Sequence, residues 1–181
     1  MSSEGDQIVM DSVLDSPTYV PQTSSKPTLA DLLTIEPSAS IFYSYARELE
    51  LSATFSNSGA KLTVFAPTNK AVMALARKPH EGPDTSGEIE LSEEQFDKAS
   101  KANVERWVSA HIVPEYPLSF DSAEHKTLLD GKVISFKPIS KAGGHGPEWG
   151  RFTLDNGARI IEKKEGLNGD LYLIDGTISI D

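Results

Sequence analysis

The feature of this sequence that most constrains its fold is a short apolar run that ends at a proline. The run Lys-Leu-Thr-Val-Phe-Ala at 61–66 is rich in β-branched and aromatic residues, which is typical of a buried strand. Pro67 follows and stops the strand, because proline has no amide hydrogen for the sheet ladder. Thr68 is placed to cap a helix that carries Val72 and Leu75. The sequence therefore predicts a buried strand that leads directly into a helix.

Two short helices are predicted before this strand. Thr28 is placed to cap the first, and the second follows Pro37. In both segments apolar residues recur at helical spacing. They are Leu29, Leu32 and Leu33 in the first helix, and Ile41, Phe42, Tyr45 and Leu49 in the second.

A surface loop and then more helix are predicted after residue 77. Segment 78–90 holds two prolines and two glycines, a composition typical of an exposed loop. Ser92 and Gln95 form a capping box, and Leu91 and Phe96 have the spacing of a hydrophobic staple. A further helix is predicted from a stripe of residues at positions i, i+3, i+4 and i+7. They are Val104, Trp107, Val108 and His111.

The last third of the chain is predicted to be β-structure. Asp130-Gly131 lies between the apolar pairs Leu128-Leu129 and Val133-Ile134, a strong hairpin signal. Further strands are expected at 152–154, 158–161 and 171–174, the last apolar on both faces and therefore buried on both sides. Because helices come mostly first and hairpin-linked strands mostly last, an α+β fold is preferred over a doubly wound sheet.

The charge balance and the absence of cysteine exclude several classes of function. Twenty-seven acidic and seventeen basic residues give a formal net charge of −10, so nucleic acid and anionic membranes would be repelled. Without cysteine there are no disulfides, thiolate zinc sites or cysteine nucleophiles. No apolar run approaches the roughly 20 residues of a membrane span, so direct membrane insertion is not expected.

The N-terminal residues have the composition of a leader or tail. Residues 1–27 are polar and punctuated by prolines, which predicts a flexible tail before a domain at 28–181, with a short strand at 16–20 as an alternative. Residues 1–10 have neither a basic n-region nor an apolar h-region. The sequence as written therefore shows no targeting signal, and we expect either a cytosolic protein or one whose signal peptide had been removed.

Four segments resemble the fasciclin-like domain family, in that family's order. The first is 62–72, Leu-Thr-Val-Phe-Ala-Pro-Thr-Asn-Lys-Ala-Val, and the last is 168–178, Asn-Gly-Asp-Leu-Tyr-Leu-Ile-Asp-Gly-Thr-Ile. Between them, 110–114 is similar to the family's central His-x-Val-Pro segment, and 127–131 to the strand and turn after it. The resemblance covers residues 28–181.

The resemblance implies both an architecture and a role. The implied fold is a fasciclin-like wedge or sandwich of two β-sheets decorated with several α-helices. The implied role is non-enzymatic adhesion at the cell surface, in the matrix, in the cell wall or in the vacuole, with a protein or carbohydrate partner. We expect no cofactor and favour a monomer.

Three residues are candidates for interaction: His111, Tyr116 and Trp149. Nearby acidic and hydroxyl residues invite a hydrolase hypothesis for His111, but its place on an apolar stripe favours a buried histidine bonded to a backbone or hydroxyl group. Trp149 follows the glycine-rich segment 143–146 and suits either an exposed anchor or packing at the edge of the core. The four histidines lack metal-ligand spacing. The alternative function is a small-ligand carrier or an enzyme with a pocket near His111 and Tyr116.

Overall fold

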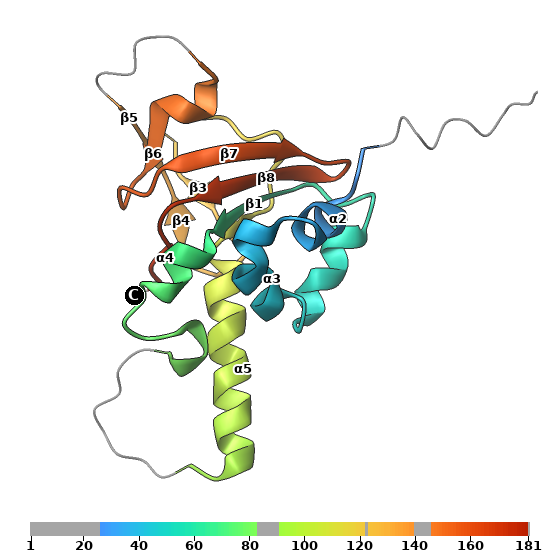
Figure 1. Cartoon of the computed structure of the whole chain (residues 1–181), viewed down its shortest axis with the longest axis vertical. Helices are drawn as coiled ribbons and strands as arrows, with labels where there is room; N and C mark the ends of the chain where they lie inside the picture. Colours follow the sequence, from blue (N-terminus) through green and yellow to red (C-terminus); the bar gives the residue numbers. More distant parts are fainter. Residues whose placement is uncertain (1–25, 83–90, 122, 140–145, 181) are drawn as a thin grey trace, which may run out of the picture.

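The computed structural model describes residues 26–82, 91–121, 123–139 and 146–180. Along the chain, the helices come mostly before the strands (Figure 1). The α-helices are α2 (Leu29–Thr34), α3 (Ser40–Ala46), α4 (Asn69–Met73) and α5 (Glu93–Ser109). The strands are β1 (Leu62–Pro67), β2 (Ile112–Val113), β3 (His125–Lys126), β4 (Val133–Ile134), β5 (Phe136–Pro138), β6 (Phe152–Leu154), β7 (Ile160–Glu165) and β8 (Gly169–Ile174). Short 3₁₀ turns cover Pro37–Ala39, Glu50–Ser56, Pro79–Glu81 and Glu148–Arg151.

A four-stranded mixed sheet forms the centre of the fold. Its strand order is β2-β1-β8-β7. Strands β1 and β8 run parallel, with Leu62 opposite Gly169 and Pro67 opposite Ile174, and the other two pairings are antiparallel. The two parallel strands are buried along their whole length, which confirms the prediction of a strand buried on both sides.

The two faces of this sheet pack against two separate cores. On one face, Leu62, Val64 and Leu171 pack with the helices. On the other, Phe65 and Tyr172 stack at 5.4 Å between ring centroids and pack with residues of the remaining strands. Because side chains alternate along a strand, one short apolar run supplies both cores. The helices lie on one side of the sheet (Figure 1).

The corner between β1 and α4 has the predicted chemistry. The Thr68 hydroxyl accepts a hydrogen bond from the amide of Ala71, as a helix cap does. The Asn69 side chain reaches back to the start of α3, where its Oδ1 accepts from the amide of Ile41 at 2.8 Å. Strand β1 extends through Pro67, one residue beyond the predicted end.

The second β layer consists of two ladders, β3-β4 and β5-β6, and not of one continuous sheet. The predicted hairpin is present and its second strand, Val133–Ile134, is confirmed, but the predicted first strand at Leu128-Leu129 is wrong. His125–Lys126 pairs with Val133–Ile134, so Asp130-Gly131 lies inside a longer turn. The amide of Leu128 instead donates to the carbonyl of Ile112. That hydrogen bond withdraws Leu128 from the ladder.

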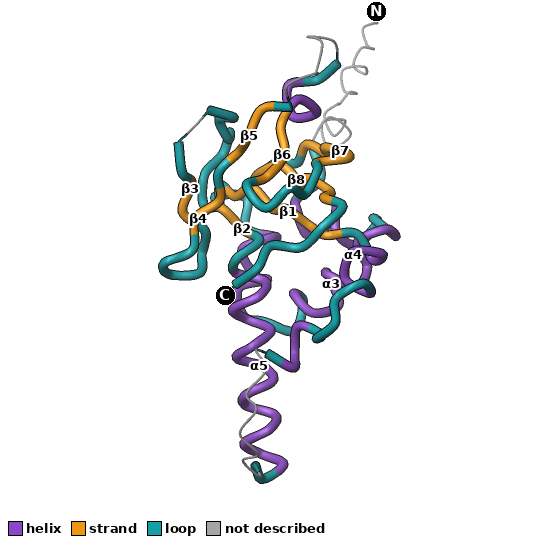
Figure 2. The backbone as a smooth tube through the Cα atoms, turned by 90° about the vertical axis from the view of Figure 1, so that its left-hand side faces the viewer, coloured by secondary structure: helices purple, strands orange, loops and turns teal. Residues whose placement is uncertain are grey.

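Two further predicted elements differ from those found. The capping box at Ser92 and Gln95 is present, but it opens one continuous helix of 17 residues, and the predicted second helix is part of it. Its first turns extend beyond the rest of the fold (Figure 2), and Leu91 and Phe96 are both exposed. Strand β7 begins at Ile160, later than predicted, because Ala158 is held in a turn by the side chain of Asn156.

Several predictions fall outside the described residues: most of the N-terminal tail with its alternative strand at 16–20, most of the loop at 78–90, and most of the glycine-rich segment at 143–146. Within the described residues, no helix is both long and apolar enough to cross a membrane. The predicted α+β class is confirmed.

Candidate functional site

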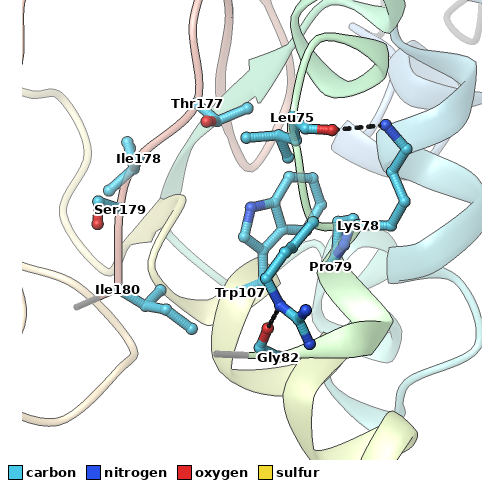
Figure 3. Close-up of a pocket in the computed structure, with 10 residues that line it drawn as sticks. Leu75, Lys78, Pro79, Gly82, Trp107, Thr177, Ile178, Ser179 and Ile180 are labelled. Atoms are coloured by element: carbon cyan, nitrogen blue, oxygen red, sulfur yellow. Dashed lines mark hydrogen bonds between the residues drawn. The ribbon is translucent and has the colours of Figure 1, made fainter. Parts of the chain in front are cut away.

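An open, mostly apolar groove of about 390 Å³ lies where α5 meets the segment that follows β8. We call it the Trp107 groove. Figure 3 shows Trp107 in its middle, with residues 177–180 along one side and Leu75, Lys78 and Pro79 along the other. The full lining is Leu75, Arg77, Lys78, Pro79, Gly82, Trp107, Thr177, Ile178, Ser179 and Ile180.

The floor of the groove is held by aromatic packing. Trp107 is 5% exposed, and its ring lies 4.7 Å from His111, 5.7 Å from Phe42 and 5.9 Å from Tyr45 between centroids. The sequence assigned Trp107 to the buried stripe of α5, and most of its surface is buried as expected. The small exposed part faces the groove. Such packing fixes the indole, so the floor is preformed.

His111 joins the floor of the groove to the wall formed by residues 177–180. Its Nδ1 donates to the carbonyl oxygen of Trp107 at 2.7 Å, and its Nε2 accepts from the amide of Ile178 at 3.0 Å. A carbonyl can only accept and an amide can only donate, so these partners fix the neutral Nδ1–H tautomer. Burial lowers the pKa of His111 to about 4, although the bond to the Trp107 carbonyl acts in the opposite direction.

The opposite wall is a turn fixed by backbone hydrogen bonds. The ammonium group of Lys78 donates to the carbonyls of Met73 and Leu75 at the end of α4, at 3.0 and 2.7 Å. Gly82 has φ +69, and a Cβ there would lie 2.5 Å from the side-chain nitrogen of Asn103. Only glycine suits both the conformation and the space. The same Asn103 nitrogen donates to the carbonyl of His80, so α5 positions the turn.

The three candidate residues lie in different settings. His111 is fully buried and bonded to backbone groups, which confirms that expectation from its place on the apolar stripe. Tyr116 is half-buried before a cis peptide bond to Pro117. Trp149 is half-buried and packs against the second core. Among the described residues, no hydrogen bond or ring contact joins any two of the three.

Residues 37–179 match the family model of the Fasciclin domain. The chain belongs to the fasciclin domain family. Fasciclin domains are generally adhesion and interaction modules, and the family is generally non-enzymatic.

The fasciclin relatives of this chain include several fungal proteins. It is 28% identical over 161 residues to a FAS1 domain-containing protein of Aspergillus fumigatus, covering 86% of this chain and 65% of the relative. A protein of the same description in Emericella nidulans is 29% identical over 161 residues, with coverages of 86% and 63%. One from Saccharomyces cerevisiae is 32% identical over 147 residues, with coverages of 77% and 49%. The chain therefore spans less than two thirds of the length of these relatives.

Among solved structures, the chain is similar to a FAS1 domain pair from the insect cell adhesion molecule Fasciclin I. The identity is 15%, the match covers 78% of this chain and 45% of that one, and the TM-score is 0.49.

Sequence reasoning did not find the fasciclin domain's groove. Its walls come from residues around 75–82 and 177–180, which are about a hundred positions apart and share no motif. The predicted pocket near His111 and Tyr116 is placed differently, because the Trp107 groove adjoins the partners of His111 and Tyr116 does not line it. No cluster of three or more acidic or histidine side chains suited to a metal occurs in the part of the chain that the structure describes.

Proposed function

We propose that this fasciclin domain is a non-enzymatic interaction module that binds a protein or carbohydrate partner, and that the Trp107 groove is its binding surface. The observation that carries this proposal is a preformed apolar groove with a tryptophan in its floor and an arginine in its lining. Tryptophan and arginine are the residues most enriched where binding energy is concentrated in interfaces. The proposal places the partner at the cell surface, in the matrix, in the cell wall or in the vacuole, as the family resemblance implies.

The chemistry of the lining supports binding and not catalysis. Among the residues that the structure describes, the lining contains hydroxyl groups, at Thr177 and Ser179, but no histidine, carboxylate or thiol. A hydroxyl nucleophile needs a base within hydrogen-bond reach. The adjacent His111 has both ring nitrogens bonded to backbone groups and lies fully buried, so it cannot accept a proton from a substrate.

The proposal is tested by partner capture with a matched pair of variants. Ile180 lines the groove, whereas Ile161 is 50% exposed on β7 and does not line it. The purified domain is immobilised and exposed to cell-wall and surface extracts, or it is applied to a glycan array. We expect the Ile161→Asp variant to retain the same partner as wild type. Ile180→Asp should lose that partner.

The test has one folding control and two outcomes that would contradict the proposal. Both variants are checked by thermal unfolding, so that a loss of capture is compared only between folded proteins. A partner retained equally by Ile180→Asp and wild type would exclude the groove as the binding surface. Turnover of a captured substrate would exclude the non-enzymatic role.

A second function, a carrier of small ligands, is favoured by the size of the same groove. Its volume of about 390 Å³ lies within the range of roughly 300–1,000 Å³ that small-molecule sites occupy. The groove is open and not enclosed, so a ligand would enter without movement of the described walls. Saturable binding of a small probe, with no macromolecular partner captured, would favour this function over adhesion.

A further inference from the structure

We propose that the Trp107 groove selects amphipathic carboxylates, meaning small molecules with an apolar body and one carboxylate group. The carboxylate would pair with Arg77, and the apolar body would lie against Trp107 and the aliphatic walls. This inference rests on the proposed role of the groove as a binding site and adds the chemical class of what it binds.

Arg77 is the charged group that is held ready for an anion. Its Nε donates to the carbonyl of Gly82 at 2.8 Å, and its Nη2 donates to the carbonyl of Glu81 at 3.3 Å. A guanidinium has five N–H donors, so these two bonds orient the group and leave donors for a ligand. Among the described residues, no carboxylate forms a salt bridge with Arg77. Carboxylates are the anions that a guanidinium fork fits best, together with phosphates.

The other two charges of this turn, on Lys78 and Glu81, have hydrogen bonds with backbone groups, and the charge of Glu81 also interacts with that of Arg77. The Glu81 carboxylate accepts a hydrogen bond from the amide of Lys78, and the Lys78 ammonium donates to two carbonyls at the end of α4. The segment from Arg77 to Glu81 therefore has two cations and one carboxylate, in a chain whose net charge is −10. In the described part of the lining the charged side chains are those of Arg77 and Lys78, which favours an anionic ligand over a cationic one.

The remaining lining requires that the anion has an apolar body. Leu75, Pro79, Ile178 and Ile180 present aliphatic surface around the indole of Trp107 (Figure 3). A bare ion such as phosphate would leave this surface in water, whereas an alkyl or aryl group would cover it. No described residue accepts a hydrogen bond from the indole nitrogen of Trp107, so the floor also holds a donor for an acceptor atom on the ligand.

The test uses Trp107 fluorescence and three probes with the same ten-carbon body. The chain has two tryptophans, so Trp149→Phe leaves Trp107 as the reporter. Decanoate, decanol and decyltrimethylammonium are titrated below their micelle concentrations. We expect saturable changes in Trp107 emission, with decanoate bound on the order of tenfold more tightly than decanol, and the cation bound most weakly.

A variant and its matched control assign the selectivity to Arg77. Arg77→Gln should lower the decanoate affinity to that of decanol and leave decanol unchanged. Arg159→Gln removes an exposed arginine that does not line the groove and should change neither affinity. Equal affinities for the three probes, or decanoate binding that is unaffected by Arg77→Gln, would overturn the proposal. Thermal unfolding of each variant shows whether it is folded.

The two proposals fail in different ways. If partner capture is lost in Ile180→Asp but the probes do not discriminate by charge, the groove is a binding surface without carboxylate selectivity. If decanoate binds selectively but no partner is captured, the carboxylate site stands and the adhesion function fails.

Discussion

The amide of Ile178 donates a hydrogen bond of 3.0 Å to Nε2 of His111, which lies 67 positions earlier in the chain. This bond fastens the segment after β8 to the end of α5 and so closes one side of the Trp107 groove. Both groups are buried, which makes the pair costly to break, since each would be left without a partner away from water.

Replacing His111 should destabilise the domain and release the segment after β8. His111→Phe keeps a ring of similar size but leaves the Ile178 amide and the Trp107 carbonyl without this partner. We expect a loss of about 2–4 kcal/mol in the free energy of unfolding, measured by urea titration at pH 7. Amide exchange at Ile178 should accelerate more than exchange within β8. Unchanged exchange at Ile178 would show that the bond does not hold the segment.

The same histidine should make stability depend on pH in the acidic range. Burial lowers the pKa of His111 to about 4, whereas an unfolded histidine titrates near 6.5. Between these values the unfolded chain binds more protons, so this stabilisation is fully present above about pH 6.5 and is lost progressively towards pH 4. The difference is on the order of 3 kcal/mol. Urea unfolding of wild type and His111→Phe between pH 7 and 4.5 should give a steeper decline for wild type, and parallel curves would contradict this.

Replacing the side-chain amide nitrogen of Asn168 should strongly destabilise the domain. It is fully buried, and its Nδ2 donates to the carbonyls of Thr54, Phe55 and Asn57, while its Oδ1 accepts from the amide of Leu29. Asn168→Asp would place a carboxylate oxygen against three carbonyls, and we expect a loss of more than 3 kcal/mol or no folding.

Asn156 provides the matched control for this substitution, because it is exposed and donates to the Thr177 carbonyl. Asn156→Asp should cost about 1 kcal/mol or less in the same urea titration. Equal losses in the free energy of unfolding for the two variants would mean that the burial of Asn168 does not explain its contribution to stability.

Asn69 should stabilise the contact between α3 and α4 through both ends of its amide. Its Oδ1 accepts from the Ile41 amide, and its Nδ2 donates to the carbonyl of Pro37 at 2.9 Å and to the hydroxyl of Ser40 at 3.1 Å. We expect Asn69→Ala to lower the free energy of unfolding by about 1–2 kcal/mol. Asn69→Asp keeps the acceptor and should cost less than Asn69→Ala. The reverse order would show that the donated bonds dominate.

Tyr172 should resist ionisation until the domain unfolds. Burial raises its pKa well above the usual value near 10, and the charges of Asp170 and Glu148 act in the same direction. A raised pKa means that the unfolded chain loses its proton first, so stability is lost as the pH rises above about 10. The ultraviolet absorbance of the five tyrosines should show one that ionises only with unfolding, and Tyr172→Phe should remove that step.

Local chemistry explains why much of the fold could be predicted. The strand at 61–66, the Thr68 cap and the box at Ser92 and Gln95 depend on residues within a few positions of one another. Their hydrogen bonds and alternation form in any fold that contains the segment. The strand predicted at Leu128-Leu129 is wrong for the opposite reason, since the amide of Leu128 pairs with Ile112, sixteen positions earlier. The residues around Asp130-Gly131 give no indication that Leu128 bonds to Ile112 and not to the other strand of the hairpin.

The sequence by itself determined the α+β class, the family and the buried role of His111, because these follow from short motifs and from the period of the apolar residues. Only the tertiary structure decided where the groove lies. It arises where parallel pairing of β1 and β8 directs residues 177–180 towards α5 and where Asn103 positions the turn that carries Arg77. Those contacts join residues far apart in the chain, and a pairing of that kind leaves no periodic mark in the sequence.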